Sequence, residues 1–125
     1  MTEDLKKRAM TALSNAYSPY SGIKVAAAVL TANGEVYTGG NVENASYGLT
    51  VCAERNAVMN AVGDGAGKLL EMAVVTDSPA VKSPCGSCRQ VLLEFAPDLE
   101  IGFYGPDGYE RHFLAKDLLP EGFSL

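Results

Sequence analysis

Residues 41–55 read Asn-Val-Glu-Asn-Ala-Ser-Tyr-Gly-Leu-Thr-Val-Cys-Ala-Glu-Arg, a polar loop with a glycine that leads into a less polar segment. Cys52 stands two residues before Glu54 in this stretch. Side chains at positions i and i+2 of a regular helix point away from one another, so these two can approach a common point only where a helix begins. The stretch therefore predicts a helix that starts at this pair and ends near residue 62, before the glycine-rich loop 63–67.

A second stretch, residues 83–90, reads Ser-Pro-Cys-Gly-Ser-Cys-Arg-Gln and contains the other two of the three cysteines. Ser83 is a favoured N-cap residue, and Pro84 is favoured at the first helical position. A helix that starts there carries Cys85 and Cys88, three residues apart, on one face and ends near residue 97. Two helix N-termini are thus expected to bring the three thiols together.

Three cysteines accompanied by a spare carboxylate are typical of a catalytic zinc site. A catalytic zinc keeps three protein ligands and leaves the fourth tetrahedral position to water. Cys52, Cys85 and Cys88 are the expected ligands of one Zn²⁺ per subunit. Glu54 is then the expected non-ligand acid and base. Arg55 follows Cys52 by three residues, so it is placed to donate a hydrogen bond to a sulfur and offset the charge of three thiolates.

Composition limits the class of protein. The 125 residues are enough for one domain, which is expected to span residues 1–125. A net charge of −5 disfavours binding to nucleic acid. No apolar run approaches the roughly 18 residues that a membrane span needs. An odd number of cysteines with a Cys-x-x-Cys pair suits a metal in a reducing compartment, so a cytoplasmic protein is predicted.

The rest of the chain predicts an α/β fold with five strands. An apolar stripe made by Leu5, Ala9, Leu13 and Ala16 indicates a first helix. The pair Asn33-Gly34 predicts a hairpin between two strands. Residues 105–108 form a short connection between the last two strands, which must be antiparallel because a parallel crossover needs about a dozen residues or more. The expected strands are residues 23–30, 35–42, 70–76, 99–104 and 109–114, and a short helix is expected over residues 115–119.

Three segments of the chain resemble those of the cytidine deaminases, in particular the small three-cysteine, homotetrameric type. They are residues 41–55, the motif S-P-C-G-S-C-R-Q-V-L-L that starts at Ser83, and the ending L-L-P-E-G-F that starts at Leu118. The resemblance covers nearly the whole chain. It implies a three-layer α-β-α sandwich with a mixed five-stranded sheet. It also implies zinc-dependent hydrolysis of cytidine and 2′-deoxycytidine to uridine and 2′-deoxyuridine in pyrimidine salvage, with release of ammonia.

The resemblance also assigns roles to single residues. Glu54 is implied to carry a proton from the zinc-bound water to N3 of the base and then to the leaving ammonia. Asn41 and Glu43 correspond to a clamp on the 3′-hydroxyl of the ribose. The backbone of Ala53 is expected near the carbonyl oxygen of the base. Ile23 stands where the family usually has a phenylalanine against the pyrimidine.

Other residues are implied to act near the edges of the site. By the same resemblance, Tyr47 and Phe123 reach across to a site of a neighbouring subunit in a homotetramer with shared sites. Gln90 and Arg89 follow the Cys-x-x-Cys pair. They either take a direct part in catalysis, with Gln90 supporting the metal ligands, or only hold the helix in place or lie at a subunit contact.

Several alternatives remain open at this point. Because Ile23 replaces an aromatic residue, the substrate could be a modified cytosine nucleoside or a blasticidin-type nucleoside. From a different class, the chain could be a non-catalytic structural zinc module in which His112 is the fourth ligand. The cysteines could also be buried thiols or a redox pair without metal. The structural module predicts four protein donors at the metal, and the deaminase predicts three with a free carboxylate.

Overall fold

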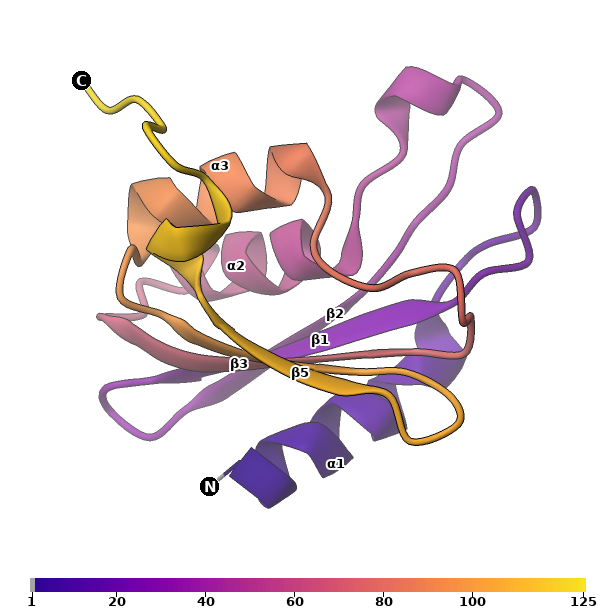
Figure 1. Ribbon diagram of the computed structural model, residues 1–125, viewed down its shortest axis with the longest axis horizontal. Helices are drawn as coiled ribbons and strands as arrows, with labels where there is room; N and C mark the ends of the chain where they lie inside the picture. The colour runs from indigo at the N-terminus through magenta and orange to yellow at the C-terminus, as the bar shows by residue number, and fades with distance from the viewer. Residues whose placement is uncertain (1) are drawn as a thin grey trace.

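The computed structural model describes residues 2–125 and has a single five-stranded sheet with helices on both faces (Figure 1). Helix α1 (Thr2–Ala12) covers one face, and helices α2 (Ala53–Gly63) and α3 (Gly86–Phe95) cover the other. This arrangement confirms the predicted three-layer α-β-α sandwich. In the part of the chain from residue 2 onward, no helix combines the length and the apolar character required to span a bilayer.

The strands lie in the order β2-β1-β3-β4-β5. Only β3 and β4 pair in parallel, and the chain between them contains α3, as a parallel crossover requires. The last two strands are antiparallel, as predicted. The sheet is therefore mixed. Its strands are β1 (Val25–Thr31), β2 (Val36–Gly40), β3 (Leu69–Thr76), β4 (Glu100–Tyr104) and β5 (Glu110–Leu114).

Within residues 2–125, three short 3-10 helices connect these elements, and the first of them corrects a predicted helix. The first helix was expected to reach Ala16, but regular α-helix ends at Ala12 and η1 (Leu13–Asn15) follows. The short last helix is η3 (Ala115–Leu118), which is also a 3-10 helix. The third, η2 (Tyr47–Leu49), lies in the loop that projects from the sheet before α2 (Figure 1).

The predicted start of α3 is wrong by two residues. Ser83 and Pro84 were expected as N-cap and first helical residue, but Cys85 is the N-cap, with extended backbone angles of φ −67° and ψ 168°. The hydroxyl of Ser83 accepts a hydrogen bond from Arg89 instead of capping the helix. Local propensity favoured the earlier start, and a side-chain contact from within the helix overrides it.

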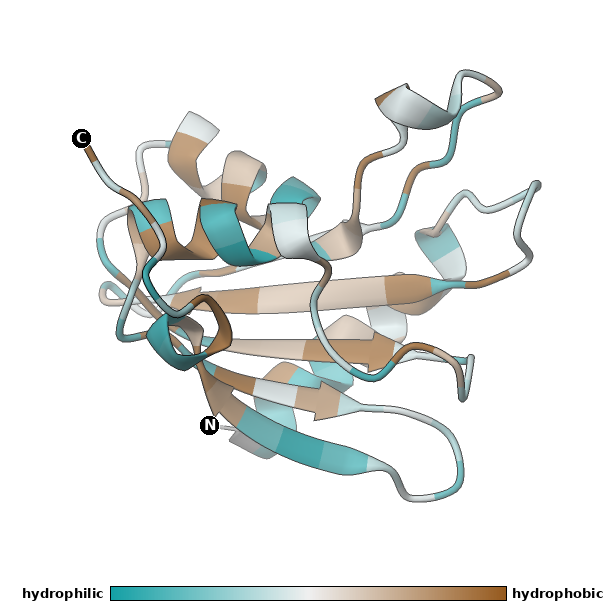
Figure 2. Ribbon diagram, turned by 45° about the horizontal axis from the view of Figure 1, so that its top comes forward, coloured by the Kyte–Doolittle hydropathy of each residue, from teal (hydrophilic) through white to brown (hydrophobic). Residues whose placement is uncertain are grey.

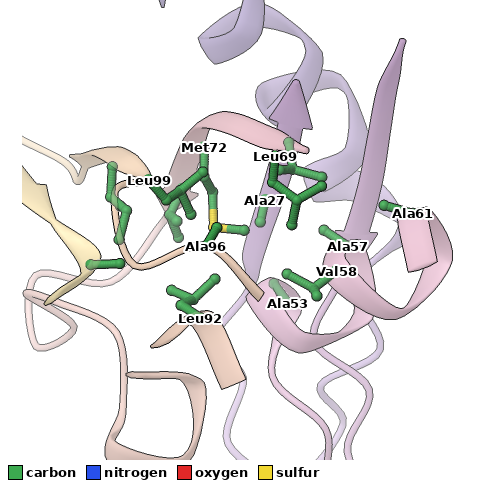
Figure 3. Packing of buried hydrophobic residues seen from close by; sticks show 14 of the residues in the cluster. Ala27, Ala53, Ala57, Val58, Ala61, Leu69, Met72, Leu92, Ala96 and Leu99 are labelled. Atoms are coloured by element: carbon green, nitrogen blue, oxygen red, sulfur yellow. The ribbon is translucent and has the colours of Figure 1, made fainter. Parts of the chain in front are cut away.

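The larger core lies between the sheet and the two helices that share a face. Figure 3 shows small alanines of α2 facing the sheet, beside Val58 and opposite Met72 and Leu92. Ala53, Ala57 and Ala61 recur every four residues, so one side of α2 is narrow enough to approach the strands closely. Figure 2 shows the resulting apolar interior, whereas the edge strand β5 is largely hydrophilic on its exposed residues.

Close approach of α2 to the sheet depends on Gly39 in β2. A Cβ atom at this position would lie 2.5 Å from the backbone nitrogen of Ala57 and 2.8 Å from the carbonyl oxygen of Ala53. Two asparagines of α2 reinforce the contact: Asn56 Nδ2 donates to Gly40 O at 2.8 Å, and Asn60 Nδ2 donates to Thr38 O at 2.9 Å. The position of the first turn of α2 is thereby fixed against an edge strand.

Gly39→Ala is expected to lower the free energy of unfolding by about 3 kcal/mol, near the upper end of typical overpacking costs, because the methyl group meets backbone atoms. Gly63→Ala is the matched control, since a Cβ there has no neighbour within 4 Å. Urea denaturation followed by circular dichroism measures both variants. A Gly39→Ala value within about 0.5 kcal/mol of the wild type would contradict the close approach.

Candidate metal centre

The start of α2 and the start of α3 meet at the three cysteines. Cys52 is the N-cap of α2, Cys85 is the N-cap of α3, and Cys88 lies in the first turn of α3. The Cys85 sulfur is 3.4 Å from the sulfur of Cys52 and 3.4 Å from that of Cys88. The prediction that two helix N-termini gather the thiols is confirmed. Neither N-cap cysteine uses its side chain to cap its helix, because both sulfurs face this cluster.

The donor set and its spacing fit a zinc ion. All three sulfurs lie within 4.8 Å of one another, and within residues 2–125 they form the only such group of potential ligands. Zn–S bonds of about 2.3 Å in a tetrahedron place neighbouring sulfurs about 3.8 Å apart. Thiolate sulfur is also a donor that zinc favours. Three donors in a tetrahedral site leave one position for a water molecule.

His112 is not a fourth ligand. It lies on β5, and its Nε2 is 2.7 Å from Glu110 Oε2 at a site where both side chains are more than half exposed. It does not belong to the group of donors that the cysteines form. The structural zinc module with His112 is therefore rejected.

Arg55 contacts the sulfur cluster, as the sequence predicted. Its Nη2 lies 3.5 Å from Cys52 Sγ and 3.5 Å from the carbonyl oxygen of Thr50. Hydrogen bonds from Cys88, Arg55 and Cys85 lower the pKa of Cys52 to about 5. The same contact to Cys52, together with burial, raises the pKa of Cys88 above its usual range. Negative charge in the cluster thus collects first on the sulfur beside the guanidinium.

Glu54 is a buried carboxyl group, with an exposed fraction of only 4%. Burial raises its pKa to about 7, and the negative charge on Cys52 adds to the effect. The backbone N–H of Glu54 and the charge of Arg55 act in the opposite direction. A carboxyl group with a pKa near neutrality can both accept and donate a proton, which suits a general acid and base.

The buried carboxyl group and part of the thiol cluster line one cavity of about 190 Å³. It brings Glu54 together with two of the sulfurs and with the predicted residues Asn41 and Ala53. Its wall also contains Ser83, which was predicted only as a helix cap, and three residues that the sequence did not single out, since nothing in their local pattern marks them. The lining consists of Val25, Asn41, Thr50, Cys52, Ala53, Glu54, Val81, Ser83 and Cys85.

Asn41 and Glu43 both hold the segment that precedes β1. The Asn41 side chain donates from Nδ2 to Ile23 O and accepts at Oδ1 from Val25 N, each at 2.9 Å. Glu43 accepts from the backbone N–H groups of Tyr20 and Ser21 at 2.9 and 3.0 Å and from the Ser21 hydroxyl. These hydrogen bonds lower the pKa of Glu43, with the Ser21 hydroxyl as the largest cause. Glu43 is therefore held as a carboxylate.

Glu43 lines a neighbouring cavity of about 340 Å³ together with Tyr47. Thr50 belongs to the walls of both cavities, so the two spaces adjoin. The Tyr47 side chain is 78% exposed, and its ring meets the Tyr20 ring edge-on with centroids 6.4 Å apart. A carboxylate and two tyrosines therefore line the cavity that adjoins the one with the buried carboxyl group.

Ile23, Phe123 and Gln90 were predicted as site residues, but none of them lines either of these two cavities. Ile23 lines neither cavity, and its backbone carbonyl accepts the bond from Asn41. Phe123 is 69% exposed near the C-terminus. Gln90 Nε2 donates to the carbonyl oxygen of Phe123 at 3.2 Å, so this side chain attaches the C-terminal segment to α3. Within one chain these residues are not brought to the metal site.

The chain is similar to known proteins in both sequence and fold. The family profile described as "Cytidine and deoxycytidylate deaminase zinc-binding region" matches residues 1–101. The cytidine deaminase of Halalkalibacterium halodurans is 42% identical over 121 residues, which cover 96% of this chain and 92% of that protein. The cytidine deaminase of Sporosarcina psychrophila is 46% identical over 123 residues, which cover 98% of this chain and 90% of that protein.

Solved structures agree with the sequence matches. The crystal structure of cytidine deaminase from Burkholderia pseudomallei has a TM-score of 0.93 and 43% identity, and the match covers 98% of this chain and 99% of that one. For the cytidine deaminase from Mycobacterium tuberculosis the TM-score is 0.85 at 45% identity, with coverage of 99% and 98%. This chain, with its three sulfurs and buried carboxyl group, therefore belongs to the cytidine and deoxycytidylate deaminase family.

Proposed function

We propose that this protein removes the 4-amino group of cytidine and 2′-deoxycytidine by hydrolysis of the C4–N bond. The products are ammonia and uridine or 2′-deoxyuridine. The observation that carries the proposal is one cavity in which the buried carboxyl group of Glu54 adjoins the thiol cluster. Similarity to cytidine deaminases over nearly the whole chain supports the same substrate class. The product is consistent with a role in pyrimidine salvage.

Glu54 is the proposed catalytic acid and base. Zinc held by three thiolates supplies a position for water and lowers the pKa of that water. The Glu54 carboxylate takes a proton from the attacking water and gives it to N3 of the base. The carboxylate then takes the second proton of that water from the new C4 hydroxyl and gives it to the departing amino group, so that the C4 carbonyl forms, one water enters and one ammonia leaves. Its pKa of about 7 favours both halves of this transfer.

The first turn of α2 is proposed to bind the base. Ala53 is the first residue of the helix, so its N–H has no acceptor within α2. It lines the cavity beside Glu54 and is placed to donate to the carbonyl oxygen of the base. A helix N-terminus also favours the partial negative charge on that oxygen.

Asn41 and Glu43 are proposed to bind the ribose while they hold the chain before β1. A carboxylate has about four acceptor positions, of which Glu43 uses three for Tyr20 and Ser21. One position is left for the 3′-hydroxyl of a sugar. The amide of Asn41 keeps one of its two N–H groups, since the other goes to Ile23. Both side chains are therefore already oriented before a nucleoside binds.

A homotetramer with shared sites is part of the proposal. Tyr47, Leu49 and Phe123 are 78%, 65% and 69% exposed in a single chain, although all three are large and apolar. Such side chains are commonly covered by another subunit. We also propose a cytoplasmic location, which the three unpaired cysteines suit.

Glu54→Gln is expected to lower kcat for cytidine on the order of a thousandfold, because an amide of the same shape cannot relay the proton. The decrease in cytidine absorbance measures turnover, and elemental analysis of the same sample measures zinc, which should remain at the wild-type level. Glu94→Gln is the matched control, since Glu94 is exposed on α3. A Glu54→Gln enzyme within about tenfold of the wild-type kcat would overturn the assignment.

Glu43→Gln is expected to raise KM for cytidine about tenfold, since an amide oxygen accepts a hydrogen bond less strongly than a carboxylate. The comparison substrate is 2′,3′-dideoxycytidine, which lacks the 3′-hydroxyl. Its KM should be similar in the wild type and in the variant. If the substitution changes KM equally for both nucleosides, Glu43 does not bind the 3′-hydroxyl.

Shared sites predict that two inactive variants restore activity when their subunits mix. Glu54→Gln and Phe123→Ala, unfolded together and refolded, should recover about a quarter of wild-type activity, the statistical share of sites built from two intact parts. Each variant refolded alone is the control. Sedimentation velocity should give four times the subunit mass. A monomer, or a mixture no more active than its parts, is incompatible with shared sites.

A further inference from the structure

The start of α3 lacks the side-chain cap that helix N-termini usually have. Cys85 occupies the N-cap position, and its sulfur faces the thiol cluster instead of the helix. Pro84 is fully buried beside it and has no N–H to donate. The carbonyl oxygen of Pro84 lies outside the hydrogen bonding of α3, which begins with Arg89 N donating to Cys85 O at 3.0 Å. Another group must hold this segment in place.

Arg89 supplies the missing contacts from within α3. Its Nε donates to Pro84 O at 2.8 Å, its Nη2 donates to Ser83 Oγ at 2.9 Å, and its Nη1 donates to Leu118 O at 2.9 Å. A guanidinium is planar and its donors have fixed directions, so three such bonds define the positions of all three acceptors. Two of the acceptors belong to the residues immediately before Cys85.

Helix α2 also has an arginine that contacts residues before the helix, but one of its acceptors is a sulfur. Arg55, in its first turn, reaches back to Thr50 O and also contacts Cys52 Sγ, both at 3.5 Å. The hydrogen bonds that Arg89 makes with its side chain go to oxygen atoms and are shorter. Arg55 therefore contacts a cysteine sulfur directly, whereas Arg89 binds the two residues that precede Cys85.

We propose that Arg89 is a positioning residue of the metal site. By fixing Ser83 and Pro84 it holds the Cys85 sulfur at its place in the cluster. By its bond to Leu118 it connects that place to η3 near the C-terminus. The inference rests on the zinc site of the proposed function. It predicts that metal retention depends on the shape of the guanidinium and not only on its charge.

The test compares Arg89→Lys, which keeps the charge but not the fork of donors, with the wild-type holoenzyme. Zinc release to the chromogenic chelator 4-(2-pyridylazo)resorcinol at 25 °C is expected to be about tenfold faster, as for lost supporting contacts in other metal sites. In the Co²⁺-substituted protein the ligand-field absorption bands should shift. Arg8→Lys, on an exposed part of α1, is the matched control. Arg55→Lys, which alters a contact to sulfur, is the comparison.

Thermal unfolding separates positioning from general stability. Faster release at a temperature well below unfolding, with shifted Co²⁺ bands, supports the inference. Wild-type release, or faster release with unchanged Co²⁺ bands, overturns it. If Arg89→Lys does not fold, Ser83→Ala removes one of the three bonds and should still accelerate release about threefold. These measurements need no substrate, so failure of the wild type to deaminate cytidine would affect the proposed function alone.

Discussion

Negative charge on closely spaced sulfur atoms is the constraint on which the rest of the structure depends. Three thiols lie within 4.8 Å of one another, and two of them occupy N-cap positions where a hydroxyl or carboxylate would normally bind the helix. Thiolates at this spacing repel unless a cation and nearby donors compensate them. Helices α2 and α3 each have a cysteine as N-cap. Each also has an arginine in or next to its first turn that donates a hydrogen bond to a residue before the helix.

The buried carboxyl group follows from the same arrangement. Because Cys52 ends the extended chain and Ala53 starts the helix, Glu54 turns inward under the first turn of α2. The alanine face of α2 and the glycine in β2 bring that turn against the sheet, which excludes water around the carboxyl group. Packing of the helix thus sets the pKa of its acid.

Sequence reasoning succeeded where a local rule was sufficient. The spacing of Cys52 and Glu54 predicted the start of α2, and the short connection 105–108 predicted the antiparallel pair of β4 and β5. It failed at the start of α3, because Arg89 competes with the cap that Ser83 could have made. The second role of Asn41, which joins Ile23 to Val25, depends on contacts between residues far apart in the chain. No local pattern records such contacts.

The edge strand β5 limits how copies of this chain can associate. Its first three residues, Glu110, Arg111 and His112, are all exposed, and their charged or polar side chains flank the unpaired edge of the strand. Such an edge disfavours the addition of a further strand from another molecule. Growth of a continuous intermolecular sheet is thereby discouraged, and closed assemblies through loops and helix surfaces are favoured over fibres.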